Sequence, residues 1–257
     1  MRLPQTLRKI WPRRNARVHL YALCWNEESM LPYFFRHYDQ TVERYFIFDN
    51  GSSDRSVEML KAHPKVRLGH FKVSGDSFVS AALEHYNHCW KSSRGQADWV
   101  IVCNVDEHVY HPDLRGYLRA CTRQGVSLVI PEGYNMVADR FPETEQRLYE
   151  VIRHGMKDEF WSKPEIFDPN KIEEINFAPG RHTAAPSGAV VTPRNTRTKL
   201  LHFKYVGLEY VCRRHSELRS GLRAVDIENG WGNQYLWDQQ RNEEEYQRLK
   251  ANAVQVF

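Results

Sequence analysis

The stretch WVIVCNVDEHVYHP, residues 99–112, decides the fold. Its first part, WVIVCNV (99–105), is apolar, as a strand buried on both faces of a parallel sheet should be. Asp106, Glu107 and His108 then follow abruptly. Adjacent acids at the end of a buried strand lose hydration unless a cation or hydrogen-bond donors meet them. The stretch therefore predicts a central strand that leads directly into a polar site.

Similar apolar runs, rich in β-forming residues, lie on both sides of this stretch, at 18–24, 44–49, 66–71 and 127–130. Helical patterns separate the runs, at 29–40, 53–63, 77–92 and 113–124. Short strands that alternate with helices are typical of βαβ units. The sequence therefore predicts an α/β fold with a mostly parallel central sheet and helices on both faces.

The regular alternation ends at Pro131, after which prolines punctuate loops and short strands. TKLLHFKY (198–205) has the pattern of one more strand, and helical patterns follow at 208–223 and 234–253. We therefore expect a single domain over 18–257, in which a regular half, 18–130, is completed by an irregular C-terminal half, 131–257.

The composition narrows the classes of partner. A net charge of +4 over 257 residues, spread along the chain, lacks the concentrated basic stripe that marks nucleic-acid binding, so no nucleic-acid partner is expected. A mild basic excess suits anionic small molecules such as nucleotide diphosphates. Five widely spaced cysteines without a CxxC pair, and no apolar run near the roughly 20 residues that span a bilayer, predict a cytoplasmic protein.

The first 17 residues, MRLPQTLRKIWPRRNAR, form a basic tail that mixes apolar side chains with arginine and lysine. Such a segment can bind weakly to an anionic membrane surface, which would place the protein at the inner face of the membrane. Pro4 and Pro12 shorten any helix there, and a disordered tail is the alternative.

Polar side chains follow the first two predicted strands. Asn26 and Glu27 come after strand 18–24, and Asp49, Asn50 and Ser52 belong to the turn DNGSSD after strand 44–49. The carboxyl ends of parallel strands meet at the edge of the sheet where ligands bind. A carboxylate there can accept hydrogen bonds from a base or a ribose. Helix capping and a tight turn are the alternative interpretation of both segments.

The acid pair suggests a metal. Asp106 and Glu107 supply the hard oxygen ligands that Mg²⁺ and Mn²⁺ prefer, and either ion can bridge to the oxygens of a diphosphate. The alternative is that both acids lie in a solvated turn.

These motifs together resemble a known family. N-E after the first strand, D-N-G-S-S-D after the second and an acid pair after an apolar fourth strand are similar to the family-2-like glycosyltransferases of the GT-A fold. The chain looks most like the bacterial group with a D-x-D-E type motif and a late H-[FY] segment. The resemblance covers about residues 18–130 well and the rest loosely.

The resemblance implies roles for these residues. Asp49, Asn50 and Ser52 would contact the base and ribose of a nucleotide sugar, with Asn26 and Glu27 shaping the pocket. Asp106, with Glu107, would hold the metal and the donor diphosphate. Asn104 stands in the donor site where the family often has its first motif acid, which weakens the expected dependence on metal.

Two later residues are further candidates. His202, in the segment HFKY, resembles the late histidine that approaches the metal in this fold, although a lone strand histidine is more often a core residue. Arg181 lies in a proline-rich loop and can clamp a phosphate with its planar guanidinium. An ordinary basic loop is the alternative for Arg181.

Transfer with inversion needs a base for the acceptor hydroxyl. The candidates are Asp226 and Asp238, with Glu228, around the aromatic segment GWGNQYLW (230–237). That segment can form a wall for the acceptor or serve as a packing corner.

The resulting hypothesis is an inverting, metal-assisted glycosyltransferase. It would move a sugar from a nucleotide-diphosphate donor, first of all a UDP-sugar, to a carbohydrate or lipid-linked acceptor, and the resemblance implies a role in surface-polysaccharide synthesis. One alternative is a transferase fold without catalysis that binds carbohydrate or nucleotide, motivated by Asn104. A nucleotidyltransferase is the other, although the segment after the first strand lacks a Gly-rich phosphate loop.

Overall fold

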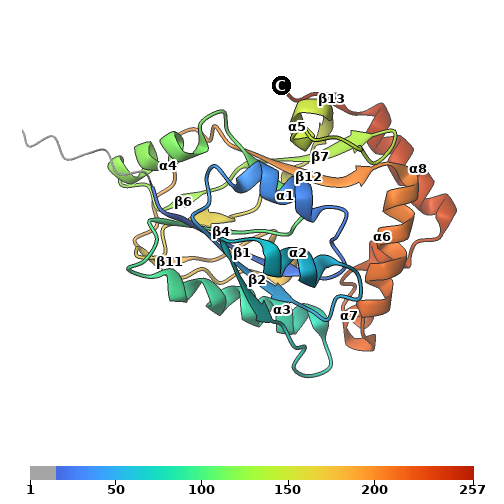
Figure 1. The fold of residues 1–257 in the computed structure, drawn as a ribbon, viewed down its shortest axis with the longest axis horizontal. Helices are drawn as coiled ribbons and strands as arrows, with labels where there is room; N and C mark the ends of the chain where they lie inside the picture. Colours follow the sequence, from blue (N-terminus) through green and yellow to red (C-terminus); the bar gives the residue numbers. More distant parts are fainter. Residues whose placement is uncertain (1–15) are drawn as a thin grey trace, which may run out of the picture.

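A computed structural model describes residues 16–257 (Figure 1). Its first sheet has six strands in the order β3-β2-β1-β4-β9-β6. These are β1 (Val18–Cys24), β2 (Arg44–Asp49), β3 (Val66–His70), β4 (Trp99–Val102), β6 (Leu128–Val129) and β9 (Ile166–Phe167). The strands β3, β2, β1 and β4 are parallel, and β9 runs antiparallel to its two neighbours. The predicted α/β fold with a mostly parallel sheet is therefore confirmed.

Helices cover both faces of this sheet. Because side chains alternate along a strand, Leu20 of β1 packs in one core with Phe34 of α1 (Leu31–Tyr38), whereas Tyr21 packs in a second core with Ala82 of α3 (Phe78–His88). The first core also takes side chains from α2 (Ser56–Ala62) and α4 (Leu114–Arg123). Figure 1 shows α1 and α3 on opposite sides of the sheet, as predicted.

A second, five-stranded sheet has the order β13-β8-β7-β12-β5. Its strands are β5 (Glu107–Tyr110), β7 (Glu132–Ala138), β8 (His154–Lys157), β12 (Lys199–Val206) and β13 (Val254–Gln255). The predicted strand 99–105 is shorter than expected, since the chain turns after Val102 and continues as β5 in this second sheet. The turn between the two sheets carries Asp106.

The C-terminal half is more regular than predicted. The seven-residue strand β7 was not expected, because its sequence EGYNMVA contains Gly133 and Asn135, which are rare inside strands. A Cβ at Gly133 would collide with the backbone of Trp161, so only glycine allows this close approach.

The remaining elements lie mostly in the second half. They are α5 (Leu148–Val151), α6 (Leu208–Gly221), α7 (Ala224–Glu228), α8 (Gln239–Ala251), the hairpin β10 (Ile172–Glu174) with β11 (Ser187–Gly188), and the 3₁₀ turns η1 (Cys89–Ser93), η2 (Glu159–Trp161), η3 (Pro179–Arg181) and η4 (Asn233–Leu236). The single helix predicted at 234–253 is wrong. Trp237 and Asp238 are extended and separate η4 from α8, and the Asp238 carboxylate caps α8.

Two features bear on the membrane prediction. The predicted basic tail, 1–17, lies outside the described residues except for Ala16 and Arg17. Among the helices of residues 16–257, none combines the length and the apolar character needed to cross a bilayer.

Candidate active site

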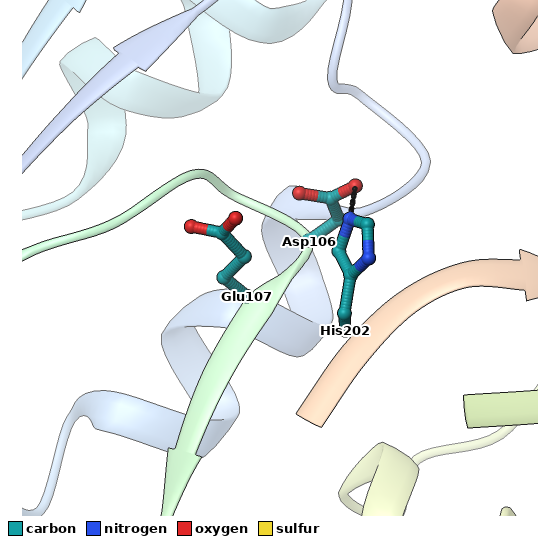
Figure 2. A group of neighbouring side chains, drawn as sticks. All are labelled: Asp106, Glu107 and His202. Atoms are coloured by element: carbon teal, nitrogen blue, oxygen red, sulfur yellow. Dashed lines mark ion pairs between the residues drawn. The ribbon is translucent and has the colours of Figure 1, made fainter. Parts of the chain in front are cut away.

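Asp106 and His202 face each other where the two sheets meet. Asp106 lies in the turn before β5, and His202 lies on β12, the neighbour of β5. The His202 Nε2 and Asp106 Oδ2 atoms are 3.2 Å apart (Figure 2). The Phe203 amide donates a hydrogen bond to the Asp106 carbonyl at 2.8 Å, which fixes the turn against β12.

The His202 ring is held in place by its neighbours. Its Nδ1 lies 3.0 Å from Oδ1 of Asn135 on β7, and the indole of Trp161 stacks on the imidazole at 3.9 Å. The Asn135 amide nitrogen donates to Asp158 at 3.4 Å, so the amide oxygen faces the histidine. Nδ1 therefore carries a proton and Nε2 points at the carboxylate, the arrangement that orients histidine ligands in metal sites.

This pair fits a divalent cation. Two acceptor atoms at 3.2 Å need a positive charge between them, either the second imidazole proton or a bound cation. Adjacent ligands of an octahedral ion with bonds of roughly 2.1 Å lie about 3.0 Å apart, close to the observed spacing. The Asp106 side chain keeps 25% of its surface exposed, so a ligand can reach it. Burial raises the pKa of Asp106, but the adjacent imidazole outweighs it and the pKa is lowered overall.

Glu107 has a different environment from Asp106, although Asp106, Glu107 and His202 form a group that could hold a metal ion. The Glu107 carboxylate is fully buried and pairs with the Lys163 ammonium and with Arg181 Nη2 at 3.2 Å. Figure 2 shows it turned away from the His202 ring. Burial alone would raise the pKa of Glu107, but the two cations hold it well below its ordinary value. The geometry therefore favours Asp106 and His202 over Glu107 as the metal-binding pair.

The contacts of Asn104 explain why an amide, and not an acid, stands at this position of the predicted motif. Its Nδ2 donates to Glu107 Oε1 at 3.3 Å, and its Oδ1 accepts from Arg181 Nη2 at 3.0 Å. An amide can bridge an anion and a cation in this way, whereas an aspartate would oppose Glu107.

Arg181 is a buried member of this network. Its residue has φ 60°, an uncommon left-handed conformation, and its guanidinium lies 4.1 Å from the centroid of the Tyr86 ring. Only 4% of Arg181 is exposed, and its contacts are with Asn104, Glu107 and Glu165. The structure therefore gives Arg181 an ion-pairing role in the interior, and the predicted phosphate clamp stays a prediction.

The loops after β1 and β2 are joined by polar side chains. The Asn26 amide donates to Ser52 Oγ at 2.9 Å, and Asn26 Oδ1 accepts from the Ser53 amide at 2.8 Å. Asp49 accepts hydrogen bonds from the backbone of Gly51 and Ser52, so its carboxylate shapes the turn. The structure thus brings Asn26, Asp49 and Ser52 together at the sheet edge. Half-buried Asn50 is held there because its backbone N–H donates a hydrogen bond to the Cys24 carbonyl.

Two cations near the candidate site were not anticipated. Arg214 of α6 pairs with Glu27 at 2.7 Å and donates to the Asn26 carbonyl at 2.8 Å. Lys204 is buried two residues beyond His202, and burial lowers its pKa to about 8, with Lys163 adding to the effect. The HFKY segment contained the signal for Lys204, whereas nothing in the local pattern marked Arg214.

The predicted catalytic bases act as helix caps. Buried Asp226 accepts from Ser77 Oγ at 2.6 Å and from the Phe78 and Val79 amides, at the start of α3. Exposed Asp238 accepts from the Arg241 amide at 2.8 Å. Within residues 16–257 neither carboxylate bonds to the Asp106 group, so their predicted role in catalysis has no support from these contacts.

Fold and site together define an α/β protein with a carboxylate–histidine pair suited to a divalent cation, beside two joined polar loops. No protein-family model matches the chain. A glycosyltransferase family 92 protein of Ricinus communis is 30% identical over 104 residues, which cover 37% of this chain and 18% of the relative. This relative confirms the resemblance to glycosyltransferases, while the particular acid motif stays a prediction.

Solved structures of low sequence identity also match the chain. The S. aureus TarS fragment 1-349 in complex with UDP-GlcNAc matches with 9% identity and a TM-score of 0.43, covering 77% of this chain and 64% of that one. Glucosyl-3-phosphoglycerate synthase of Mycobacterium tuberculosis, in complex with Mn²⁺, UDP and phosphoglyceric acid, matches with 15% identity and a TM-score of 0.33, covering 47% of this chain and 43% of that one.

Proposed function

We propose that the protein is a nucleotide-sugar-dependent glycosyltransferase that moves a sugar from a nucleotide diphosphate to a carbohydrate or lipid-linked acceptor. The observation that carries the proposal is the Asp106–His202 pair, accessible at the sheet edge and spaced for a divalent cation. The family 92 relative supports it over part of the chain. UDP-sugars are the first donors to test, because they are the donors implied by the family resemblance.

The metal would be Mn²⁺ or Mg²⁺, held by Asp106 and His202. When bound, it would neutralise charge on the leaving diphosphate. The chain's own residues prepare the same environment: Lys204 and Arg214 add positive charge near the pair, and Asn135 keeps His202 in the ligating orientation. Preorganised charge of this kind stabilises a departing anion.

Division of labour between the halves is part of the proposal. Residues 18–130 would form the donor half within one domain, with Asn26, Glu27, Asp49, Asn50 and Ser52 at the nucleotide and Asn104 positioning the acid turn. Residues 131–257 would complete the acceptor side. Inversion at the anomeric carbon, the surface-polysaccharide pathway, the cytoplasmic location and a membrane contact of 1–17 rest on the sequence analysis alone. Since Asp226 and Asp238 cap helices, the proposal assigns neither of them as the base.

A second candidate is a transferase fold that binds nucleotide without catalysis. Asn104 favours it, because the usual first motif acid is missing. Its hydrogen bonds to Glu107 and Arg181 give Asn104 a structural role that is compatible with either candidate.

Thermal unfolding in the presence of nucleotides tests the proposal. UDP, GDP, dTDP and CMP are each added with and without manganese, because a ligand of the folded state raises the unfolding midpoint. We expect a nucleotide-selective rise that grows with manganese and is lost in Asp106→Asn. Asp139→Asn is the matched control, since this acid is 78% exposed and pairs with Lys250.

Turnover separates the two candidates. Release of UDP from UDP-sugars is measured in the same proteins. Release that needs manganese and Asp106 supports the transferase, whereas nucleotide binding without release supports the binding module. A protein that responds to no nucleotide contradicts both.

A further inference from the structure

A cavity of about 620 Å³ opens between α6, η4 and α8. It lies in the second half of the chain, and Figure 1 shows α6 and α8 side by side there. Its volume falls within the roughly 300–1,000 Å³ of small-molecule sites. The residues that matter for its chemistry are Cys212, His215, Tyr235, Trp237 and Asn242.

His215 lines this cavity, and one of its ring nitrogens has no hydrogen-bond partner among the described residues. Its Nδ1 lies 2.7 Å from Oδ1 of Asn242, whose Nδ2 donates to the carbonyls of Trp237 and Asp238. These bonds orient the amide, so Nδ1 of His215 carries the proton and Nε2 carries a lone pair. His215 is 1% exposed, and its Nε2 has no hydrogen-bond partner among the described residues.

A ligand hydroxyl would satisfy this nitrogen. A buried polar atom without a partner costs about 1–3 kcal/mol, so such atoms in native proteins call for a partner. Burial lowers the pKa of His215 to about 3, with nearby Lys204 adding to the effect, so the ring is neutral near pH 7 and accepts a hydrogen bond at Nε2.

Two aromatic rings lie near the His215 ring. The centroid of the His215 ring lies 5.3 Å from that of Tyr235 and 6.3 Å from that of Trp237. Aromatic rings offer apolar faces, and their edges or polar tips can still meet polar groups. A pyranose has the matching combination, with C–H groups on its faces and hydroxyls around its rim.

The cavity adjoins the candidate active site through Tyr235. The Lys204 ammonium lies 4.9 Å from the centroid of the Tyr235 ring. Burial is the main cause that raises the pKa of Tyr235, and the negative charge of Asp106 adds to it. Helix α6 connects the two places as well, since Arg214 contacts Glu27 and the next residue, His215, lines the cavity.

We propose that this cavity binds a saccharide unit of the acceptor, with Tyr235 and Trp237 against the sugar ring and His215 Nε2 accepting a hydroxyl hydrogen bond. The assignment as an acceptor site rests on the proposed glycosyltransferase function. If the cavity is the acceptor site, the acceptor is a glycan with at least one hexopyranose unit.

Saturation-transfer NMR with methyl hexopyranosides tests the site in the full chain. The probes are the α and β methyl glycosides of glucose, galactose and mannose, in the presence of UDP and magnesium. We expect at least one to bind, and Trp237→Ala to weaken it about tenfold, equivalent to ~1.4 kcal/mol. Trp231→Ala is the matched control, because Trp231 belongs to the same segment but does not line the cavity. Equal affinity in the two variants, or no binding to the wild-type protein, overturns the proposal.

His215→Gln provides a second variant if Trp237→Ala does not fold. It should weaken glycoside binding while the rise in midpoint with UDP stays at its wild-type value. The two proposals fail in different ways: a UDP response without glycoside binding overturns only the acceptor site. Glycoside binding without a UDP response overturns the transferase and leaves the cavity as a saccharide site.

Discussion

The two halves of the chain contribute opposite charges to the candidate site. The regular half, 18–130, supplies three acids, and the half from 131 to 257 supplies their partners together with one further buried acid, Glu165. The pairs are Glu27 with Arg214, Asp106 with His202, and Glu107 with Lys163 and Arg181. These three acids therefore meet their charged partners only when both halves fold together.

The same comparison separates the neighbours Asp106 and Glu107. The Glu107 carboxylate has no exposed surface and pairs with two cations, and we call such a group a closed charge. The Asp106 carboxylate, an open charge, keeps a quarter of its side chain exposed and faces a single imidazole. A closed charge holds the halves together, and an open charge remains available to a ligand. Four substitutions test this distinction.

The largest loss of stability is expected for Lys163→Met. Lys163 is 1% exposed and pairs with Glu107, so its removal leaves a buried carboxylate with Arg181 as its remaining cation among the described residues. Breaking a buried pair on one side costs about 3–5 kcal/mol. Urea unfolding at neutral pH measures the change in the free energy of unfolding. A loss below about 1 kcal/mol, the range of surface pairs, would show that Glu107 is not a closed charge.

Glu165→Gln should change the pH dependence of stability. Burial raises the pKa of Glu165 well above its ordinary value, and the charge of Glu107 adds to the effect. The folded protein therefore keeps a proton that the unfolded chain has released, so this group makes stability fall as pH rises above its unfolded pKa. Glutamine does not titrate. As pH rises, the free energy of unfolding of the variant should therefore increase relative to that of the wild-type protein, by up to about 1.4 kcal/mol per pH unit.

The comparison for Glu165→Gln uses unfolding at pH 5.5 and pH 7.5. Histidines titrate alike in the two proteins, so their contribution cancels in the difference. Stability curves that run parallel between these pH values would mean that Glu165 is ionised in the folded protein.

Asn104→Asp tests whether the side-chain amide of Asn104 stabilises the buried Glu107 carboxylate. The new carboxylate would lie where Nδ2 now donates to Glu107 at 3.3 Å, so a hydrogen bond is replaced by repulsion. Arg181 offsets part of this, and we expect a loss of about 1–3 kcal/mol in the free energy of unfolding. The loss should shrink as the pH falls, because a proton on the introduced carboxyl removes the repulsion with Glu107. A variant as stable as the wild-type protein at neutral pH would remove our explanation of the absent motif acid.

Much of the fold was predictable because its signals are local. The apolar runs of the first sheet and the helix that begins at Leu208 were found from periodicity within short windows. The strand Glu132–Ala138 was missed because the glycine at 133 is required by the close approach of the Trp161 backbone. The strand's own sequence does not reveal that contact.

The site was predictable only in part. The family resemblance suggested Asp106 and His202 as partners, and the structure places them together. The partners of Glu107 and Glu27 could not be predicted, since Lys163 and Arg214 lie 56 and 187 residues away in the chain. Asp226 illustrates the converse, because an acid that caps a helix and an acid that serves as a base look alike in sequence.

The smallest effect is expected for Lys157→Met, the same substitution at an ion pair outside the site. Lys157 pairs with Glu132 at 3.0 Å, but their side chains are 49% and 40% exposed, and both residues belong to the second half. Water solvates either charge when its partner is lost, and salt screens the attraction. The unfolding midpoint should therefore stay within error of the wild-type value, at low and high salt. A loss comparable to that of Lys163→Met would mean that any lysine-to-methionine change harms this fold, and the contrast between closed and open charges would no longer explain the result at Glu107.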